Sequence, residues 1–168
     1  AAGGAGAARE VAAAAPDERT EAFLGEFFKK ALKLAAIRLA DLSERLRLPQ
    51  AVLQNAYAVV ENAVYEQTRL LYNRHLDQLI LSALYGVCKV NHINTPFRDI
   101  IAQYRKQPQS RQDVFRNVVL EITSPGLEVV RRGDIIEFYN KVFIPHMKGF
   151  LLQLNQAQAA AAAAAAAA

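Results

Sequence analysis

Residues that could grip a peptide gather in two short segments, 81–90 (LSALYGVCKV) and 133–145 (GDIIEFYNKVFIP). Residues four apart in a helix project the same way, so each segment would present its candidates on one face. These candidates are Tyr85 and Lys89 in the first segment and Ile136, Asn140 and Ile144 in the second. A groove holds an extended peptide with such a combination, because apolar pockets take its side chains and polar groups bind its main chain. The two segments therefore predict peptide capture rather than catalysis.

No pattern typical of an enzyme accompanies these segments. The sequence has no glycine-rich phosphate loop and no cysteine and histidine cluster at metal-ligand spacing. The histidines His75, His92 and His146 lie far apart, and a capping or surface role is expected for Asp77. The single cysteine, Cys88, lies in an apolar run and is expected to be a small buried hydrophobe. We expect a non-enzymatic protein with no cofactor and no metal.

The elements that position the candidate residues are predicted to be helices. Apolar spacing and cap or proline signals place them at about 20–46, 49–66, 74–90, 95–104, 110–119 and from Asp134 onward, with Pro145 kinking or restarting the last. The inner face of the first helix is assigned to Phe23, Phe27, Leu34, Ile37 and Leu42. An exposed loop is expected over 121–132, with a turn at Ser124-Pro125-Gly126, and no strand is predicted.

The helix predicted over 74–90 is nearly continuous in apolar residues. A helix that is apolar on most sides is buried on most sides, which places it at the centre of the domain. The predicted fold class is therefore all-α, a helical bundle around one central hydrophobic helix.

Composition divides the chain into a folded domain and two tails. Residues 1–16 are rich in alanine and glycine, and residues 156–168 run into unbroken alanine. Neither end has the large apolar residues that a core needs, although polyalanine forms helix readily. The sequence thus predicts one domain over residues 17–155.

Charge and hydropathy limit the classes of partner. The formal net charge of +4 favours acidic partners without requiring nucleic acid. Arg111, Arg116, Arg131 and Arg132 lie close in sequence, but no recognition-helix motif accompanies them, so no direct nucleic-acid binding is expected. No segment is apolar over the length of a membrane span, so no membrane association is expected of this soluble, intracellular protein.

Several ordered blocks resemble the B half of the retinoblastoma family pocket. They are NRHLDQLILSALYGVCKV (73–90), FRDIIAQYRKQPQ (97–109), VFRNVV (114–119) and DIIEFYNKVFIP (134–145). The RKQP stretch and the FIP end resemble most the retinoblastoma-related proteins of plants and green algae. The resemblance runs from about Phe23 to Leu154 and implies a cyclin-like helical fold.

The resemblance also implies a site for partners that carry a Leu-x-Cys-x-Glu motif. Tyr85, Lys89, Tyr139 and Asn140 would hold the main chain and polar groups of the peptide, and Phe97, Val90, Ile136 and Ile144 would line pockets for its leucine and cysteine. A basic rim of Lys89, Arg98, Arg105, Arg116 and Lys148 would favour its glutamate and flanking acidic residues.

Partners implied by the family are histone deacetylase complexes, D-type cyclins and viral oncoproteins. Cell-cycle transcription factors would bind through the full pocket, and the expected role is a nuclear repressor of transcription. The sequence departs from the family in lacking the A half of the pocket, so an exposed apolar flank is expected. An alternative interpretation is a cyclin-fold regulatory or general transcription factor subunit that contacts a kinase or nucleic acid.

Overall fold

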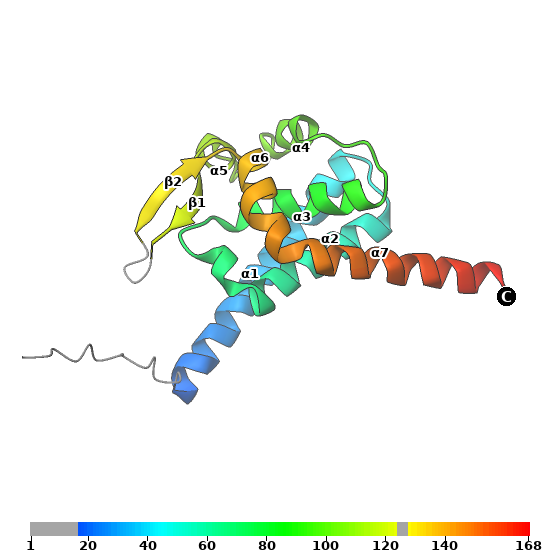
Figure 1. Ribbon diagram of the computed structural model, residues 1–168, viewed down its shortest axis with the longest axis horizontal. Coiled ribbons are helices and arrows are strands. Elements are labelled where there is room, and N and C mark those ends of the chain that lie inside the picture. Colours follow the sequence, from blue (N-terminus) through cyan, green and yellow to red (C-terminus); the bar gives the residue numbers. More distant parts are fainter. Residues whose placement is uncertain (1–16, 124–127) are drawn as a thin grey trace, which may run out of the picture.

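A computed structural model describes residues 17–123 and 128–168, so the predicted tail at 1–16 lies outside the described residues. The elements are α1 (Glu18–Arg45), α2 (Gln50–Glu66), the 3-10 turn η1 (Thr68–Leu71), α3 (Leu76–Val90), α4 (Phe97–Tyr104), α5 (Gln112–Arg116), β1 (Val118–Ile122), β2 (Val129–Gly133), α6 (Ile135–Phe138), the π-helical turn η2 (Tyr139–Phe143) and α7 (Ile144–Ala166) (Figure 1).

Helix α3 is the centre of the bundle, as predicted. Most of its residues are buried, including Leu79, Leu81 and Leu84. It contacts α1, α2, α4, α5, η2 and α7. Each fully buried leucine contributes roughly 1.5–3 kcal/mol of hydrophobic stabilisation. The predicted all-α bundle around a central hydrophobic helix is confirmed.

Side-chain caps fix where several helices begin. Asp17 accepts a hydrogen bond from the Thr20 amide at 2.8 Å, and Asp134 accepts one from the Glu137 amide at 2.8 Å. Such caps satisfy donors that the first helical turn leaves unpaired. The predicted helix start at Asp134 is confirmed. The predicted cap at Ser110 is wrong, because its hydroxyl donates to the Arg105 carbonyl at 3.0 Å.

The predicted inner face of α1 is confirmed at Leu42, which is buried, and wrong at the other four residues. Phe23 is 70% exposed, Phe27 53% and Ile37 60%, and Leu34 is also exposed. Besides Leu42, the buried residues of α1 are Leu32, Ala35, Leu39 and Ser43. Both sides of α1 carry apolar side chains, and the bundle covers the side with small Ala35, which lets neighbouring helices approach closely. We call the uncovered side, formed by Phe23, Phe27, Leu34 and Ile37, the outer face of α1.

The prediction that the chain has no strand is also wrong. Strands β1 and β2 form an antiparallel hairpin at one end of the bundle, beside α5 and α6 (Figure 1). Helix α5 ends at Arg116, so Val119 lies in a strand rather than in the predicted helix. Three consecutive residues of β1, Val118 to Leu120, are buried. The predicted turn at Ser124-Pro125-Gly126 lies outside the described part of the chain.

Helix α7 carries the chain out of the bundle. It begins at Ile144, with Pro145 in its first turn, which confirms that the helix restarts at this proline. It runs through the alanine segment to Ala166, and Asn55 of α2 donates to the Gln158 side chain at 2.9 Å. Within the described ranges, α7 included, no helix is long and apolar enough to cross a membrane.

Candidate functional site

Four aromatic rings bring the two predicted peptide-binding segments together. The Tyr85 ring of α3 stacks on Phe97 of α4 with centroids 4.0 Å apart. Tyr139 of η2 meets both rings edge-on, at 4.8 Å from Tyr85 and 5.6 Å from Phe97, and stacks on Phe143 at 5.7 Å. Aromatic pairs in these geometries add to the stability that burial provides. Segments far apart in the sequence therefore share one aromatic cluster, formed by Tyr85, Phe97, Tyr139 and Phe143.

The turn that holds Tyr139 is π-helical. The Ile144 amide donates to the Tyr139 carbonyl, five residues back, and the next residue, Pro145, has no amide hydrogen to donate. A regular α-helical ladder therefore cannot continue through this point. π-helical turns inside α-helices occur frequently at functional sites. Here the turn lies between α6 and α7 and carries both Tyr139 and Asn140.

The Tyr139 ring is buried and its hydroxyl lies over Gly86 of α3. A Cβ at Gly86 would lie 3.4 Å from that hydroxyl oxygen and 3.1 Å from Leu151 Cδ1. Burial and, to a smaller extent, the nearby Tyr85 raise the pKa of Tyr139 to about 12. The phenol therefore keeps its proton at neutral pH and can donate a hydrogen bond.

Two cavities are lined by residues of the predicted site. The first, of about 580 Å³, lies among α4, α5 and α6, and we call it the arginine cavity; it is lined by Arg98, Ile101, Ala102, Arg105, Phe115, Arg116, Asp134, Ile135 and Ile136. The second, of about 360 Å³, lies at the end of α3, and we call it the lysine cavity; it is lined by Tyr85, Lys89, His92, Ile93, Asn94, Thr95 and Pro96.

The predicted site residues divide between these cavities. Tyr85 and Lys89 line the lysine cavity, and the Lys89 ammonium lies 5.7 Å from the centroid of the Tyr85 ring. The predicted residues Arg98, Arg105, Arg116 and Ile136 line the arginine cavity. Phe97 precedes Arg98 and belongs to the aromatic cluster.

The other predicted residues line neither cavity. Val90 and Ile144 are half-buried and pack against the core. Asn140 is exposed, and within the described residues its side chain makes no hydrogen bond. Lys148 is exposed on α7.

The sequence interpretation missed some of the residues that line these cavities. Ile93, Thr95 and Pro96 belong to the loop between α3 and α4, and Ile101 and Phe115 contribute apolar wall. In the sequence, Thr95 and Pro96 indicated only the start of a helix. Their position beside Lys89 could not be predicted, because it depends on how α4 packs against α3.

The remaining groups that could do chemistry have structural roles. Cys88 is buried, and burial raises the pKa of its thiol, which keeps it protonated and unreactive. His75 caps α3, and His146 Nδ1 lies 2.7 Å from the Val142 carbonyl. His92 adopts a left-handed φ of 57° just after α3. No group of acidic, histidine and cysteine side chains in the part of the chain that the structure describes could hold a metal ion.

Residues 23–148 match the family description "Retinoblastoma-associated protein B domain". That match covers well over half of the chain. The chain belongs to the retinoblastoma family. Its sequence is 44% identical over 146 residues to retinoblastoma-related protein 3 of Zea mays, covering 84% of this chain and 14% of that protein.

Two further relatives support the same assignment. The retinoblastoma-related protein of Cocos nucifera is 45% identical over 134 residues, which is 78% of this chain and 13% of that protein. Retinoblastoma-related protein 1 of Pisum sativum is 41% identical over 146 residues, which is 83% of this chain and 14% of that protein. The chain therefore spans about one seventh of the length of these relatives, as a B half of the pocket with a cyclin-like helical fold.

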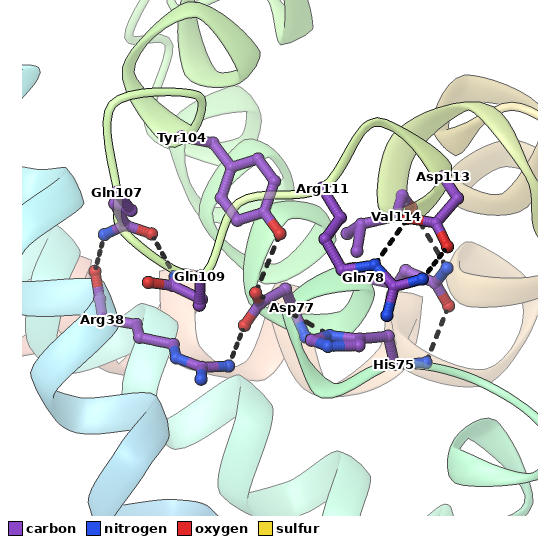
Figure 2. A network of polar contacts seen from close by, with 10 residues as sticks. All are labelled: Arg38, His75, Asp77, Gln78, Tyr104, Gln107, Gln109, Arg111, Asp113 and Val114. Carbon is purple, nitrogen blue, oxygen red and sulfur yellow. Dashed lines mark hydrogen bonds and ion pairs between the residues drawn. The ribbon is translucent and has the colours of Figure 1, made fainter.

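A buried polar network joins three helices of this retinoblastoma B domain (Figure 2). Asp77 of α3 is 1% exposed; it pairs with the Arg38 guanidinium of α1 and accepts a hydrogen bond from the Tyr104 hydroxyl of α4 at 2.9 Å. Gln107 extends the network by donating to the Arg38 carbonyl at 3.1 Å. The predicted capping or surface role of Asp77 is wrong, because this carboxylate is the buried centre of the network.

Gly86 in α3 and Gly149 in α7 of the retinoblastoma B domain form a matched pair. Comparing them measures how tightly Tyr139 and Leu151 pack against α3. Gly149→Ala in α7 is expected to raise the free energy of unfolding by about 0.5–1 kcal/mol, because a Cβ there meets no atom within 4 Å. Gly86→Ala is expected to gain less, because Leu151 and the Tyr139 hydroxyl must move. Urea unfolding followed by circular dichroism measures both changes, and equal gains would contradict the packing described.

Proposed function

We propose that this domain is a docking module that binds partner proteins carrying a Leu-x-Cys-x-Glu motif. The observation that carries the proposal is the aromatic cluster, which joins the two predicted peptide-binding segments, together with two cavities lined by other residues of the predicted site. We propose that an extended peptide crosses the cluster. Pockets for alternate side chains with polar groups between them are the usual means of extended-peptide recognition.

The proposed roles follow from side-chain chemistry and exposure. Exposed Asn140 can both donate to and accept from a peptide main chain, and its amide has no competing partner among the described side chains. Tyr85 and Tyr139 offer apolar rings with polar tips. The Lys89 ammonium lies over the Tyr85 ring and contributes a positive charge.

The pockets for the leucine and the cysteine of the motif are proposed to be apolar. Phe97, Val90, Ile136 and Ile144 supply their walls. Ile136 is 49% exposed although it is a large apolar residue, so a bound peptide would remove apolar surface from water there.

The basic rim is proposed to favour acidic residues of the partner. Each exposed ion pair is worth about 0.2–1 kcal/mol and is screened by salt, so the rim acts mainly on association rate and specificity. Raising the salt from about 50 to 300 mM is expected to weaken binding of a motif peptide severalfold without abolishing it. Fluorescence anisotropy of a labelled peptide measures this change, and absence of binding by the folded domain at either salt would refute the docking function.

The outer face of α1 is proposed to be covered by the A half of the pocket. Phe23, Phe27, Leu34 and Ile37 form an apolar face that the rest of this domain leaves in contact with water. Large exposed apolar patches commonly mark interaction surfaces. The ring of Phe28 also packs edge-on against Tyr65 of α2, with ring centroids 5.6 Å apart. Aromatic side chains therefore continue from α1 onto α2.

The whole protein is proposed to be a nuclear, non-enzymatic repressor of transcription. Relatives named as retinoblastoma-related proteins support this role. In that setting the domain would recruit histone deacetylase complexes or D-type cyclins through the motif, and viral oncoproteins would compete for the same site. Cell-cycle transcription factors would bind only the full pocket, in which both halves are present.

A further inference from the structure

A third cavity, of about 300 Å³, lies among η1, β1, η2 and α7, and we call it the hairpin cavity. It is lined by Arg69, Leu70, Tyr72, Arg74, Leu120, Glu121, Ile122, Thr123, Val142 and His146. None of these residues belongs to the proposed docking site, and none lines the arginine cavity or the lysine cavity. The volume is at the lower end of the range for small-ligand sites, so it suits a ligand about the size of one residue.

Arg74 is a half-buried cation in the lining of the hairpin cavity. Its Nε donates to the Val119 carbonyl at 2.7 Å, and its guanidinium lies 5.2 Å from the centroid of the Phe138 ring. Its Nη1 donates, at longer distances of 3.3 and 3.5 Å, to the carbonyls of Arg69 and Leu70. All of these partners are neutral, and within the described residues no carboxylate pairs with Arg74.

This environment favours an added anion beside Arg74. Burial lowers the pKa of the Arg74 guanidinium, which shows that the surrounding protein does not compensate its charge fully. A charge that is partly removed from water attracts an opposite charge more strongly than an exposed one does. Its planar fork of donors also matches the two oxygens of a carboxylate.

The other charges in the lining limit the anion to a single negative charge. Arg69 is exposed and forms no ion pair in the part of the chain that the structure describes, and the same holds for Glu121 of β1. With His146 counted as neutral, two arginines less one glutamate give the lining a formal charge of +1. One carboxylate balances this charge. A phosphomonoester carries about −1.5 to −2 and would also be repelled by Glu121.

Apolar side chains form much of the remaining wall. Leu70 and Leu120 are buried, Val142 is half-buried, and Tyr72 is 41% exposed. A ligand with an apolar body would remove part of this surface from water. The lining therefore combines a place for one carboxylate with a place for an apolar group.

We propose that the hairpin cavity binds an apolar ligand that carries one carboxylate, either a small organic acid or the last residue of a peptide. The carboxylate would pair with Arg74 and Arg69, and the apolar group would pack against Leu70, Leu120 and Val142. This site shares no residue with the docking groove, so the inference does not depend on the docking function.

The test is an NMR titration of the isotope-labelled domain with two acids, 3-phenylpropionate and the peptide acetyl-Ala-Phe with a free carboxylate. The amide of each acid keeps the same apolar body without the charge, and phenyl phosphate carries a larger charge. At least one acid is expected to shift the amide signals of residues 69–74 and 120–123, with a dissociation constant of about 1 mM. Its amide and phenyl phosphate are expected to bind at least about tenfold more weakly.

Variants locate the effect in the hairpin cavity. Arg69→Gln is expected to weaken binding of the acid about fivefold, and Glu121→Gln to strengthen it about twofold, because both groups are exposed. Arg19→Gln, in the first turn of α1, removes the same charge outside the lining and is expected to leave binding unchanged. Thermal unfolding of each variant verifies that it is folded.

The two acids also distinguish the sources of the carboxylate. Binding of 3-phenylpropionate alone assigns the site to small organic acids, and binding of the peptide alone assigns it to a chain terminus. Equal binding of an acid and its amide, or tighter binding of phenyl phosphate, would overturn the proposal. Absence of binding by both acids, or an equal loss in Arg19→Gln and Arg69→Gln, would also overturn it.

Discussion

Asp77→Ala is expected to lower the free energy of unfolding by about 3 kcal/mol, because it leaves the Arg38 guanidinium and the Tyr104 hydroxyl without their shared partner. Asp77 is 1% exposed, whereas 17% of the Arg38 side chain reaches solvent. This partial exposure lets Arg38 recover some hydration, so the loss falls at the lower end of the range for buried ion pairs. Urea unfolding followed by circular dichroism measures the change.

Asp113→Ala is the matched control for this loss. It removes the same side chain from an ion pair with Arg111 whose partners are 66% and 48% exposed, and Figure 2 shows it beside the buried network. Exposed pairs contribute about 0–1 kcal/mol, so this variant should lose less than 1 kcal/mol. Equal losses of unfolding free energy in the two variants would contradict the conclusion that Asp77 is the centre of the buried network.

The Tyr139→Phe/Asn140→Ala double variant is expected to weaken binding of the Leu-x-Cys-x-Glu peptide about a hundredfold. It removes a phenol donor and an amide that both donates and accepts, and two or three hydrogen bonds of about 1 kcal/mol each account for a loss of that order. The free energy of unfolding should change by less than about 1 kcal/mol, since the Phe ring keeps the aromatic cluster and Asn140 is exposed. Fluorescence anisotropy and urea unfolding measure the two quantities.

Tyr65→Phe/Asn62→Ala makes the same chemical change on α2. These residues line a separate cavity with Phe150, so motif binding should be unaffected. If the Tyr139→Phe/Asn140→Ala variant binds the peptide as well as the unchanged protein does, the peptide uses another surface. A cyclin-fold subunit that contacts its partners elsewhere would then be the better interpretation.

Helix positions were predictable where local signals agreed. The apolar run of α3, the cap at Asp134 and the restart at Pro145 all depend on residues within one or two turns of each other. The inner face of α1 was not predictable in this way. Apolar periodicity identifies the buried face only when the opposite face is polar, and α1 has apolar residues on both sides.

The hairpin was missed because its pairing is not local. Val118 pairs with Gly133 and Val119 with Arg132, and the ladder contains register shifts, so alternation along β1 is irregular. Three successive buried residues in β1 resemble a helix end as much as a strand. Only the fold brings the two strands beside each other.

The sequence indicated which segments contribute to the candidate site, but not how they are arranged in three dimensions. Tyr85 and Tyr139 belong to separate segments, and only the fold shows that their rings meet at 4.8 Å. A capping or surface role was expected for Asp77, whereas its charged partner is Arg38, far away in the sequence. The three arginines of the arginine cavity likewise come from α4, the residue just after it and α5, and only the fold brings them to one cavity.

The central claim is that a Leu-x-Cys-x-Glu peptide lies across the aromatic cluster. Its most direct test is an NMR titration of the isotope-labelled domain with this peptide and with a control peptide that has alanine at the three motif positions. The account predicts amide shift changes concentrated in residues 85–98 and 135–144 with the motif peptide, and none with the control. Changes centred on the outer face of α1, or equal changes with both peptides, would contradict it.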